Sequence, residues 1–261
     1  MDSSNDIFAY HFLITIMPVL PTIALDTNIW IYLTKEVFYE LFIKLKQGKE
    51  DEEFTVLVND VVIKEWQRNK AKTITSLADN IKIEYKSAKS LANHLSVEAR
   101  TKLLESLAEY KDEASRIKKA TERVNSVEEF MLSCKVFDTT DEQKLYIAKL
   151  AIEKQPPFQN NKNNFNDALN YRSFCEFTEG SFPHQYDLIY VSNNPEDFID
   201  KQTKEVYGSI TKGLNSMSIK NVTDLGEALQ LAPELIDDFD DWIDAQIDDE
   251  AMYQLDIIRG K

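Results

Sequence analysis

Thr22-Ile23-Ala24-Leu25-Asp26-Thr27-Asn28 is the stretch that decides the fold, because an apolar run here ends in a carboxylate. The residues up to Leu25 carry no charge, which is typical of a strand buried on both faces. In an open parallel sheet, ligands bind beyond the carboxyl ends of the strands. The stretch therefore predicts that Asp26 lies at the functional edge of such a sheet.

Strand and helix patterns alternate along the rest of the chain. Asn59 or Asp60 is a plausible N-cap for the helix that carries Glu65, and Pro156-Pro157 ends another helix. Alternation of this kind predicts an α/β fold with a mainly parallel central sheet and helices on both faces. The expected strands cover residues 22–26, 54–58, 188–191 and 217–222, and the expected helices 30–46, 60 onward, 141–154, 167 onward and 224 onward.

The long segment between Arg68 and Asn125 contains no glycine and has helical apolar spacing amid many charges. We expect two or three amphipathic helices here, forming an insertion at about residues 70–140. The whole domain then spans residues 22–232. It follows an N-terminal segment, residues 1–21, and precedes an acidic C-terminal helix or tail, residues 233–261.

Charge is distributed unevenly in this chain, whose net charge is −15. The tail after Ala232 holds ten acidic and two basic residues, whereas residues 60–125 hold fourteen basic and ten acidic ones. Global acidity therefore does not exclude a polyanionic substrate. The tail is either an amphipathic helix docked on the domain, a polyanion mimic that covers the basic residues 60–125, or a surface for a protein partner.

The N-terminal segment contains an apolar run from Ile7 to Leu25 but lacks the basic start and small-residue cleavage site of a signal peptide. We expect it to pack on the core of a cytoplasmic protein that does not enter a membrane. Two distant cysteines and three scattered histidines make zinc chemistry and a histidine-based triad unpromising.

Two further acidic motifs accompany Asp26. Glu65 stands in Val61-Val62-Ile63-Lys64-Glu65-Trp66, and Asp167 in Asn164-Phe165-Asn166-Asp167-Ala168-Leu169, each near the start of a helical pattern. Carboxylates that converge without histidine or cysteine suit a hard divalent cation, Mg²⁺ or Mn²⁺. Simpler readings stay open: Asp26 and Asp167 as acids at helix starts, and Glu65 paired with Arg68 or Asn69.

Together with Tyr190-Val191-Ser192-Asn193-Asn194-Pro195-Glu196-Asp197-Phe198, these motifs resemble the PIN domain, a family of metal-dependent nucleases. The resemblance covers about residues 22–230 and is closer to a bacterial PIN-like branch with a helical insertion. It implies that Asp26, Glu65 and Asp167 bind the metal, with Asn28 orienting Asp26 or a metal-bound water.

The fourth motif departs from the family pattern, in which a carboxylate closely follows the strand-ending Ser or Thr. Asn193 and Asn194 stand there instead, and the next acid is Asp197. By the resemblance, Asn193, Asn194 and Asp197 are candidate metal ligands, with Asn194 also in the catalytic set. The two asparagines could also simply form a turn.

The resemblance implies endonucleolytic hydrolysis of phosphodiester bonds, of RNA rather than DNA, in a toxin-like or phage-defence role. A non-catalytic PIN-like module that binds nucleic acid or protein is the alternative, and a phosphatase for small phosphates is another. The basic helix face with Lys64, Arg68, Lys70 and Lys72 either contacts phosphates or is only solvated.

Overall fold

The computed structural model describes residues 20–160, 164–181, 188–214 and 219–232. Its centre is a five-stranded sheet with the strand order β3-β2-β1-β4-β5, in which every pairing is parallel. The expected mainly parallel α/β architecture is confirmed. The strands are β1 (Thr22–Leu25), β2 (Thr55–Asn59), β3 (Lys135–Phe137), β4 (Leu188–Val191) and β5 (Ile219–Val222).

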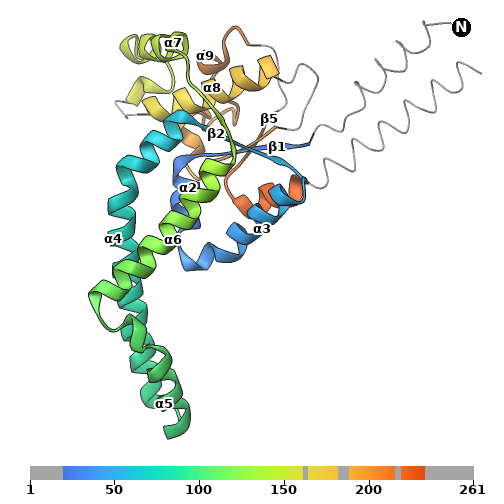
Figure 1. Ribbon diagram of the computed structural model, residues 1–261. Helices are drawn as coiled ribbons and strands as arrows, with labels where there is room; N and C mark the ends of the chain where they lie inside the picture. Colours follow the sequence, from blue (N-terminus) through green and yellow to red (C-terminus); the bar gives the residue numbers. More distant parts are fainter. Residues whose placement is uncertain (1–19, 161–163, 182–187, 215–218, 233–261) are drawn as a thin grey trace, which may run out of the picture.

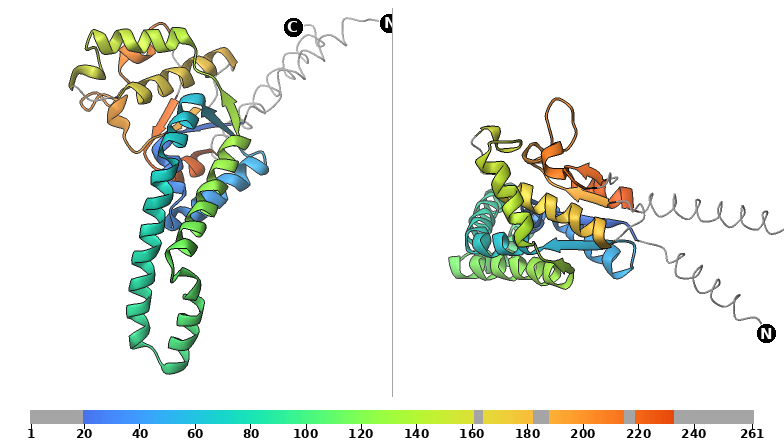
Figure 2. Two further views of the ribbon diagram at one scale, coloured as in Figure 1. Left: turned by 60° about the vertical axis from the view of Figure 1, so that its left-hand side comes forward. Right: turned by 90° about the horizontal axis from the view of Figure 1, so that it is seen from above.

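Helices cover both faces of this sheet (Figures 1 and 2). Alternate residues of β1 explain the two cores: Ile23 and Leu25 join one apolar cluster, whereas Ala24 joins the other. The first cluster packs under α2 (Thr27–Leu33), α3 (Tyr39–Glu50), α6 (Glu113–Ser133) and a helix at residues 225–232. The second packs under α7 (Asp141–Ile152), α8 (Phe165–Ser181) and α9 (Gly208–Thr211).

A helical arm projects from the sheet (Figures 1 and 2). Its stem is α4 (Asp60–Leu91), a 32-residue helix about 48 Å long, with α6 returning beside it. The tip contains η2 (Ala92–His94), α5 (Val97–Ser106) and η3 (Ala108–Tyr110). Buried Leu77 and Ala78 of α4 share a cluster with Ala120 and Val124 of α6, so the stem has its own apolar seam continuous with the core.

The expected single helix at residues 30–46 is wrong in its bounds, because the chain breaks between α2 and η1 (Glu36–Phe38). The Thr34 hydroxyl donates to the Ile31 carbonyl at 2.7 Å, and Lys35 then adopts extended dihedrals of −80° and 143°. A side-chain hydrogen bond of this kind competes with helix propagation. Gly48, expected in a turn, lies inside α3, where the Phe54 ring packs against it.

Strand β3 was not expected from the sequence. Of its three residues only Phe137 is buried, so no apolar run marks it. It forms because Leu57, Val58 and Asn59 of β2 offer an unpaired edge to Lys135, Val136 and Phe137.

The N-terminal segment and the acidic C-terminal segment fall almost entirely outside the described residues, so the division at residues 21 and 232 stays a prediction. Within the part that is described, no helix combines the length and the apolar character needed to cross a bilayer.

Candidate functional site

The strand order places a topological switch point between β1 and β4. From β1 the chain goes to β2 on one side, whereas β4 lies on the other side. Crossover loops diverge at such a point and leave room at the carboxyl ends of the strands. Asp26 follows β1 and Ser192 follows β4, with Leu25 and Val191 in register just before them. The motif around Asp26 therefore stands at the edge where an α/β sheet binds its ligands.

Asp26 is buried, with 4% of its surface exposed, and both carboxylate oxygens accept hydrogen bonds. The Thr27 amide donates to Oδ1 at 2.7 Å, which makes Asp26 the N-cap of α2, and the Ser192 hydroxyl donates to Oδ2 at 2.9 Å. Capping and a functional role are compatible, because each oxygen has its own partner. Oδ1 caps α2, whereas Oδ2 is held by Ser192, which follows β4. The carboxylate is thus fixed by neutral donors.

Glu65 reaches the same edge from the second turn of α4. Asn59 caps this helix by accepting from the Val61 amide at 2.7 Å, so β2 runs into α4 without an intervening loop. The Thr27 hydroxyl donates to Glu65 Oε2 at 2.9 Å. Thr27 therefore ties Asp26 and Glu65 together, one through its amide and the other through its hydroxyl.

Asp167, in the first turn of α8, completes the group of carboxylates. Burial, followed by the negative charges of Asp26, Asp197 and Glu65, raises the pKa of Asp167 to about 7. Burial also raises the pKa of Asp26 to about 6, although its hydrogen bonds from Ser192 and Thr27 lower it. The negative charge of Glu65 on α4 thus acts on both Asp26 and Asp167, as expected if the three carboxylates face a common centre.

The fourth motif turns back toward this centre. The Ser192 hydroxyl accepts from the Asn194 backbone amide at 3.2 Å while donating to Asp26. Asp197 is the last residue of η5 (Pro195–Asp197), and its amide donates to the Asn194 carbonyl at 3.1 Å. The Asn194 backbone, rather than its exposed side chain, makes this contact. Asn193 Oδ1 is buried and accepts no hydrogen bond within the described residues. Asp197 contributes negative charge at both Asp26 and Asp167.

The donor set fits a hard divalent cation, because it consists of carboxylate oxygens and one orphaned amide oxygen. Within the described residues, however, no three acidic, histidine or cysteine side chains are close enough to hold an ion directly. Mg²⁺ commonly keeps several waters and uses only one or two protein carboxylates. The arrangement is compatible with that mode of binding.

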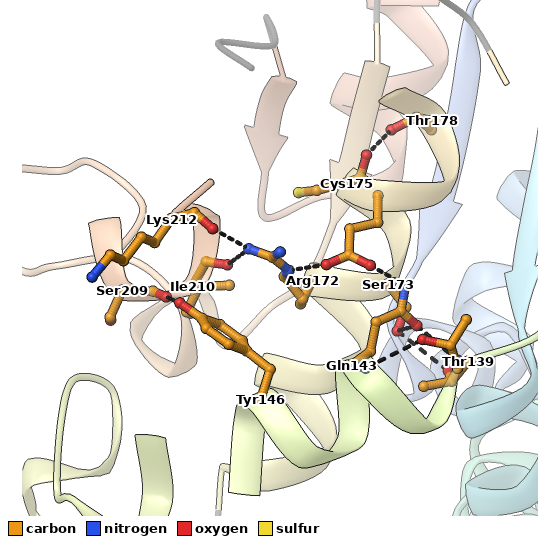
Figure 3. A network of polar contacts seen from close by, with 12 residues as sticks. Thr139, Gln143, Tyr146, Arg172, Ser173, Cys175, Thr178, Ser209, Ile210 and Lys212 are labelled. Atoms are coloured by element: carbon orange, nitrogen blue, oxygen red, sulfur yellow. Dashed lines mark hydrogen bonds and ion pairs between the residues drawn. The ribbon is translucent and has the colours of Figure 1, made fainter. Parts of the chain in front are cut away.

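A polar network holds α8 against its neighbouring helices (Figure 3). Arg172 donates through Nη1 to the carbonyls of Ile210 and Lys212 at 2.8 and 2.9 Å, and through Nε to Glu176. Gln143 of α7 donates to Glu176 at 2.6 Å. The network thus joins α7, α8 and α9 through Arg172 and Glu176 of α8, the helix whose first turn carries Asp167.

The same network reaches the carboxyl edge of the sheet through hydroxyl groups. Ser173 donates to Gln143 at 3.0 Å and to Thr139 at 3.3 Å, and the Thr139 hydroxyl donates to Asn59 Oδ1 at 2.9 Å. The Thr139 amide also donates to Asp60 at 2.9 Å. The start of α4 and the face of α8 are therefore fixed against each other by hydrogen bonds.

Thr27 and Ser192 are the contributors that sequence reasoning did not assign a role, although both stood inside quoted motifs. Buried Tyr190 is another: its hydroxyl accepts from Nδ2 of the Asn170 side chain at 2.9 Å. Burial, followed by the charges of Asp26 and Asp167, raises the pKa of Tyr190. A serine or tyrosine at a strand end gives little signal by itself. Their positions two residues apart on a strand, pointing to the same face as Asp26, could have drawn notice.

Comparison with known proteins supports the resemblance seen in the sequence. A family model described as PIN domain matches residues 23–198, which include Asp26, Glu65, Asp167 and the fourth motif. Neither the curated proteins nor the solved structures gave a match. The match spans more than half of the chain and agrees with the parallel sheet on which these residues stand. The chain belongs to the PIN domain family.

Proposed function

We propose that this protein is a metal-dependent endonuclease that hydrolyses phosphodiester bonds in RNA. The observation that carries the proposal is the grouping of Asp26, Glu65 and Asp167 near the switch point, where burial and neighbouring negative charges raise the pKa values of Asp26 and Asp167. Among their contacts in the described residues, all side-chain hydrogen bonds to Asp26 and Glu65 come from neutral hydroxyls. Such a group is prepared to take up a cation.

Asp26, Glu65 and Asp167 are the proposed ligands of Mg²⁺ or Mn²⁺, assisted by Asn193, Asn194 or Asp197. The bound cation would supply charge neutralisation at the phosphate and an activated water. The residues of the chain have the task of positioning. Ser192 and Thr27 hold the Asp26 carboxylate, and the Thr27 hydroxyl holds Glu65, so that little reorganisation is needed during reaction.

The RNA preference and a toxin-like or phage-defence role in the cytoplasm rest on the family resemblance. A protein partner that binds through the acidic residues 233–261 rests on their charge alone. The catalytic proposal does not depend on either point.

Cleavage assays with single-stranded RNA and DNA test the proposal, with Mg²⁺ or Mn²⁺ added or chelated. We expect RNA cleavage that requires the cation and is lost in Asp26→Asn. Asp141→Asn, which removes an exposed carboxylate on α7, is the matched control and keeps full activity. Metal-independent cleavage, or equal activity in Asp26→Asn, would contradict the proposal.

A non-catalytic PIN-like module is the second candidate. Asn193 and Asn194 at the carboxylate positions favour it, as does the spacing of the acids, which form no direct ion-binding triad within the described residues. This candidate predicts nucleic-acid binding without cleavage by any cation. Hydrolysis of phosphomonoesters with no cleavage of polynucleotides would instead identify a phosphatase.

A further inference from the structure

A polar groove runs along the stem of the arm, lined by residues that follow Asp26 and Glu65 in the sequence. It has a volume of about 280 Å³ and lies between α2 and α4. Asn28, two residues after Asp26, is among its lining residues. Its polar lining comes from Asn28, Thr34, Lys35, Asn69, Lys72, Thr73, Ser76 and Asn80.

The α4 side of the groove continues the helix face that carries Glu65. Asn69, Thr73, Ser76 and Asn80 follow Glu65 at intervals of three or four residues, the spacing that keeps side chains on one face. The direction of the groove is therefore set by the helix that also supplies a proposed metal ligand. A chain held at the carboxylates would continue along this face.

The groove also differs in charge from the rest of this acidic protein. No aspartate or glutamate is among its lining residues, whereas Lys35 and Lys72 are. Other α4 lysines are neutralised nearby: Lys64 pairs with Asp60, and Lys70 pairs with Glu128 at 2.6 Å. Lys72 makes no ion pair within the described part of the chain. Lys35 lies over the Tyr32 ring at 4.2 Å and likewise lacks an acidic partner there.

Beyond Asn80 the groove opens into a larger cavity of about 810 Å³, which shares Thr34, Lys35, Leu77 and Asn80 with it. This cavity lies between α4 and α6 at the middle of the arm. Tyr85 of α4 and Tyr110 of η3 line it, and its charged lining residues are of both signs: Glu36, Glu84 and Glu122 with Lys35, Lys119 and Arg123. Both tyrosines are half-buried, and within the described residues neither ring contacts another aromatic ring.

We propose that these two cavities form the binding track of a single-stranded RNA, which runs from the carboxylates along α4 to Tyr85 and Tyr110. The backbone phosphates lie near Lys72 and Lys35, and bases stack on the tyrosines. Cationic grooves combined with aromatic platforms bind single strands in this way. This inference rests on the proposed function, since it names the substrate of the same site.

The length of the track sets the length of the ligand. Glu65 and Tyr85 are separated by twenty helical residues, about 30 Å. A strand with stacked bases advances about 3.4 Å per nucleotide, so it needs about nine nucleotides to reach Tyr85. An RNA of about four nucleotides would contact the lysines but not the tyrosines.

Binding of fluorescent RNA of about twelve and about four nucleotides to Asp26→Asn protein, with Mg²⁺ present, tests the track without cleavage. The double variant Lys35→Ala/Lys72→Ala should weaken the binding of both RNAs. It should also reduce the slope of log affinity against log salt by about 1.4, since each phosphate contact contributes about 0.7. Lys82→Ala, an exposed lysine on the opposite face of α4, is the control and should change neither quantity.

Tyr85→Ala should weaken the binding of the longer RNA at least about fivefold and leave the binding of the shorter RNA unchanged. Equal effects on both lengths, an unchanged salt slope in the double lysine variant, or tighter binding of duplex than of single strands would overturn the track. These outcomes are separate from catalysis. Metal-dependent cleavage with unaltered binding by the variants rejects the track alone, whereas binding along the track without cleavage rejects the nuclease proposal alone.

Discussion

At the scale of single residues, Thr27 joins the two halves of the candidate site, because its amide binds Asp26 and its hydroxyl binds Glu65. Thr27→Val keeps the shape and the amide but removes the hydroxyl. Groups that orient ligands typically change metal affinity or activity by 10–100-fold when lost. We expect a loss of about 10-fold or more in metal-dependent cleavage, measured with the cation at several concentrations.

Thr27→Ser retains the hydroxyl and should restore most of the activity lost in Thr27→Val. If both variants were equally impaired, the methyl group and its packing would matter rather than the hydrogen bond to Glu65.

Asp26 and Asp167 also predict how stability depends on pH when divalent cations are chelated. Their pKa values are raised from 3.8 to about 6 and about 7 in the folded protein, so folding favours their protonated forms. Deprotonation between pH 4 and 7 then costs the folded state more than the unfolded state, and stability falls as the pH rises through that window. At about 1.4 kcal/mol per pKa unit, Asp26 alone contributes about 3 kcal/mol.

Urea unfolding in chelator at pH 4.5 and pH 7.5 measures this fall, and Asp26→Asn should flatten it. Asp60 acts outside this window. Burial raises its pKa, but its hydrogen bonds with Lys64 and Thr139 lower it overall, so its contribution to stability is lost only below pH 3.8. Stability that rose from pH 4.5 to 7.5 would mean that the two carboxyl groups are not under strain.

At the scale of elements, Arg172 fixes α8 to the segment at α9 through two carbonyls and to Glu176 through an ion pair. Arg172→Met should keep the packing volume but leave these acceptors without their donor. Breaking a buried pair in this manner costs about 3 kcal/mol or more. The free energy of unfolding measures the loss, and Lys102→Ala, which breaks an exposed pair on α5, should change it little.

The α3 helix gives a second test, at Gly48. A Cβ added there would stand 2.4 Å from the Phe54 ring, which is 3% exposed and cannot move into solvent. Helix propensity favours alanine by about 1 kcal/mol, but overpacking costs about 1–3 kcal/mol. We expect Gly48→Ala to lower the melting temperature, and less so when combined with Phe54→Leu. Gly208→Ala meets no atom within 4 Å and serves as the control.

Sequence reasoning predicted the elements that carry continuous apolar runs, namely β1, β2 and β4. It missed β3, since Lys135 and Val136 are exposed and the strand is defined by pairing with β2. It also joined α2 to α3, because apolar spacing continues across Thr34 while the break depends on one hydroxyl. The local sequence pattern indicates which residues are buried, but it does not indicate which of two competing hydrogen bonds forms.

The candidate site shows the same division. Asp26, Glu65 and Asp167 could be singled out because carboxylates near apolar runs are conspicuous, and the charges of Asp26 and Glu65 help to raise the pKa of Asp167 in the structure. The hydroxyls of Thr27 and Ser192 and the buried Tyr190 phenol gave a much weaker signal, since their roles depend on neighbours 38, 166 and 20 positions away in the chain.

At the scale of the whole molecule, metal binding should add to the free energy of unfolding. A cation that binds only the folded protein stabilises it by about 2.7 kcal/mol at a concentration one hundred times its dissociation constant. We expect Mn²⁺ to raise the melting temperature, and Asp26→Asn to lose that gain. Sodium chloride at equal ionic strength and the Asp141→Asn variant are the controls. An equal response in Asp26→Asn would show that Asp26 is not a ligand.

The direct passage from β2 into α4 has a mechanical consequence. Glu65 lies about 7 Å along a rod of about 48 Å, measured from its capped start. If the rod pivots at that start, the tip moves roughly six times as far as Glu65. A displacement of a few ångströms at α5 then shifts Glu65 by a fraction of an ångström, and misplacement on the scale of 1 Å can change rates about a hundredfold. The arm therefore acts as a reducing lever: a displacement of several ångströms at its far end becomes a much smaller change in the position of the Glu65 carboxylate.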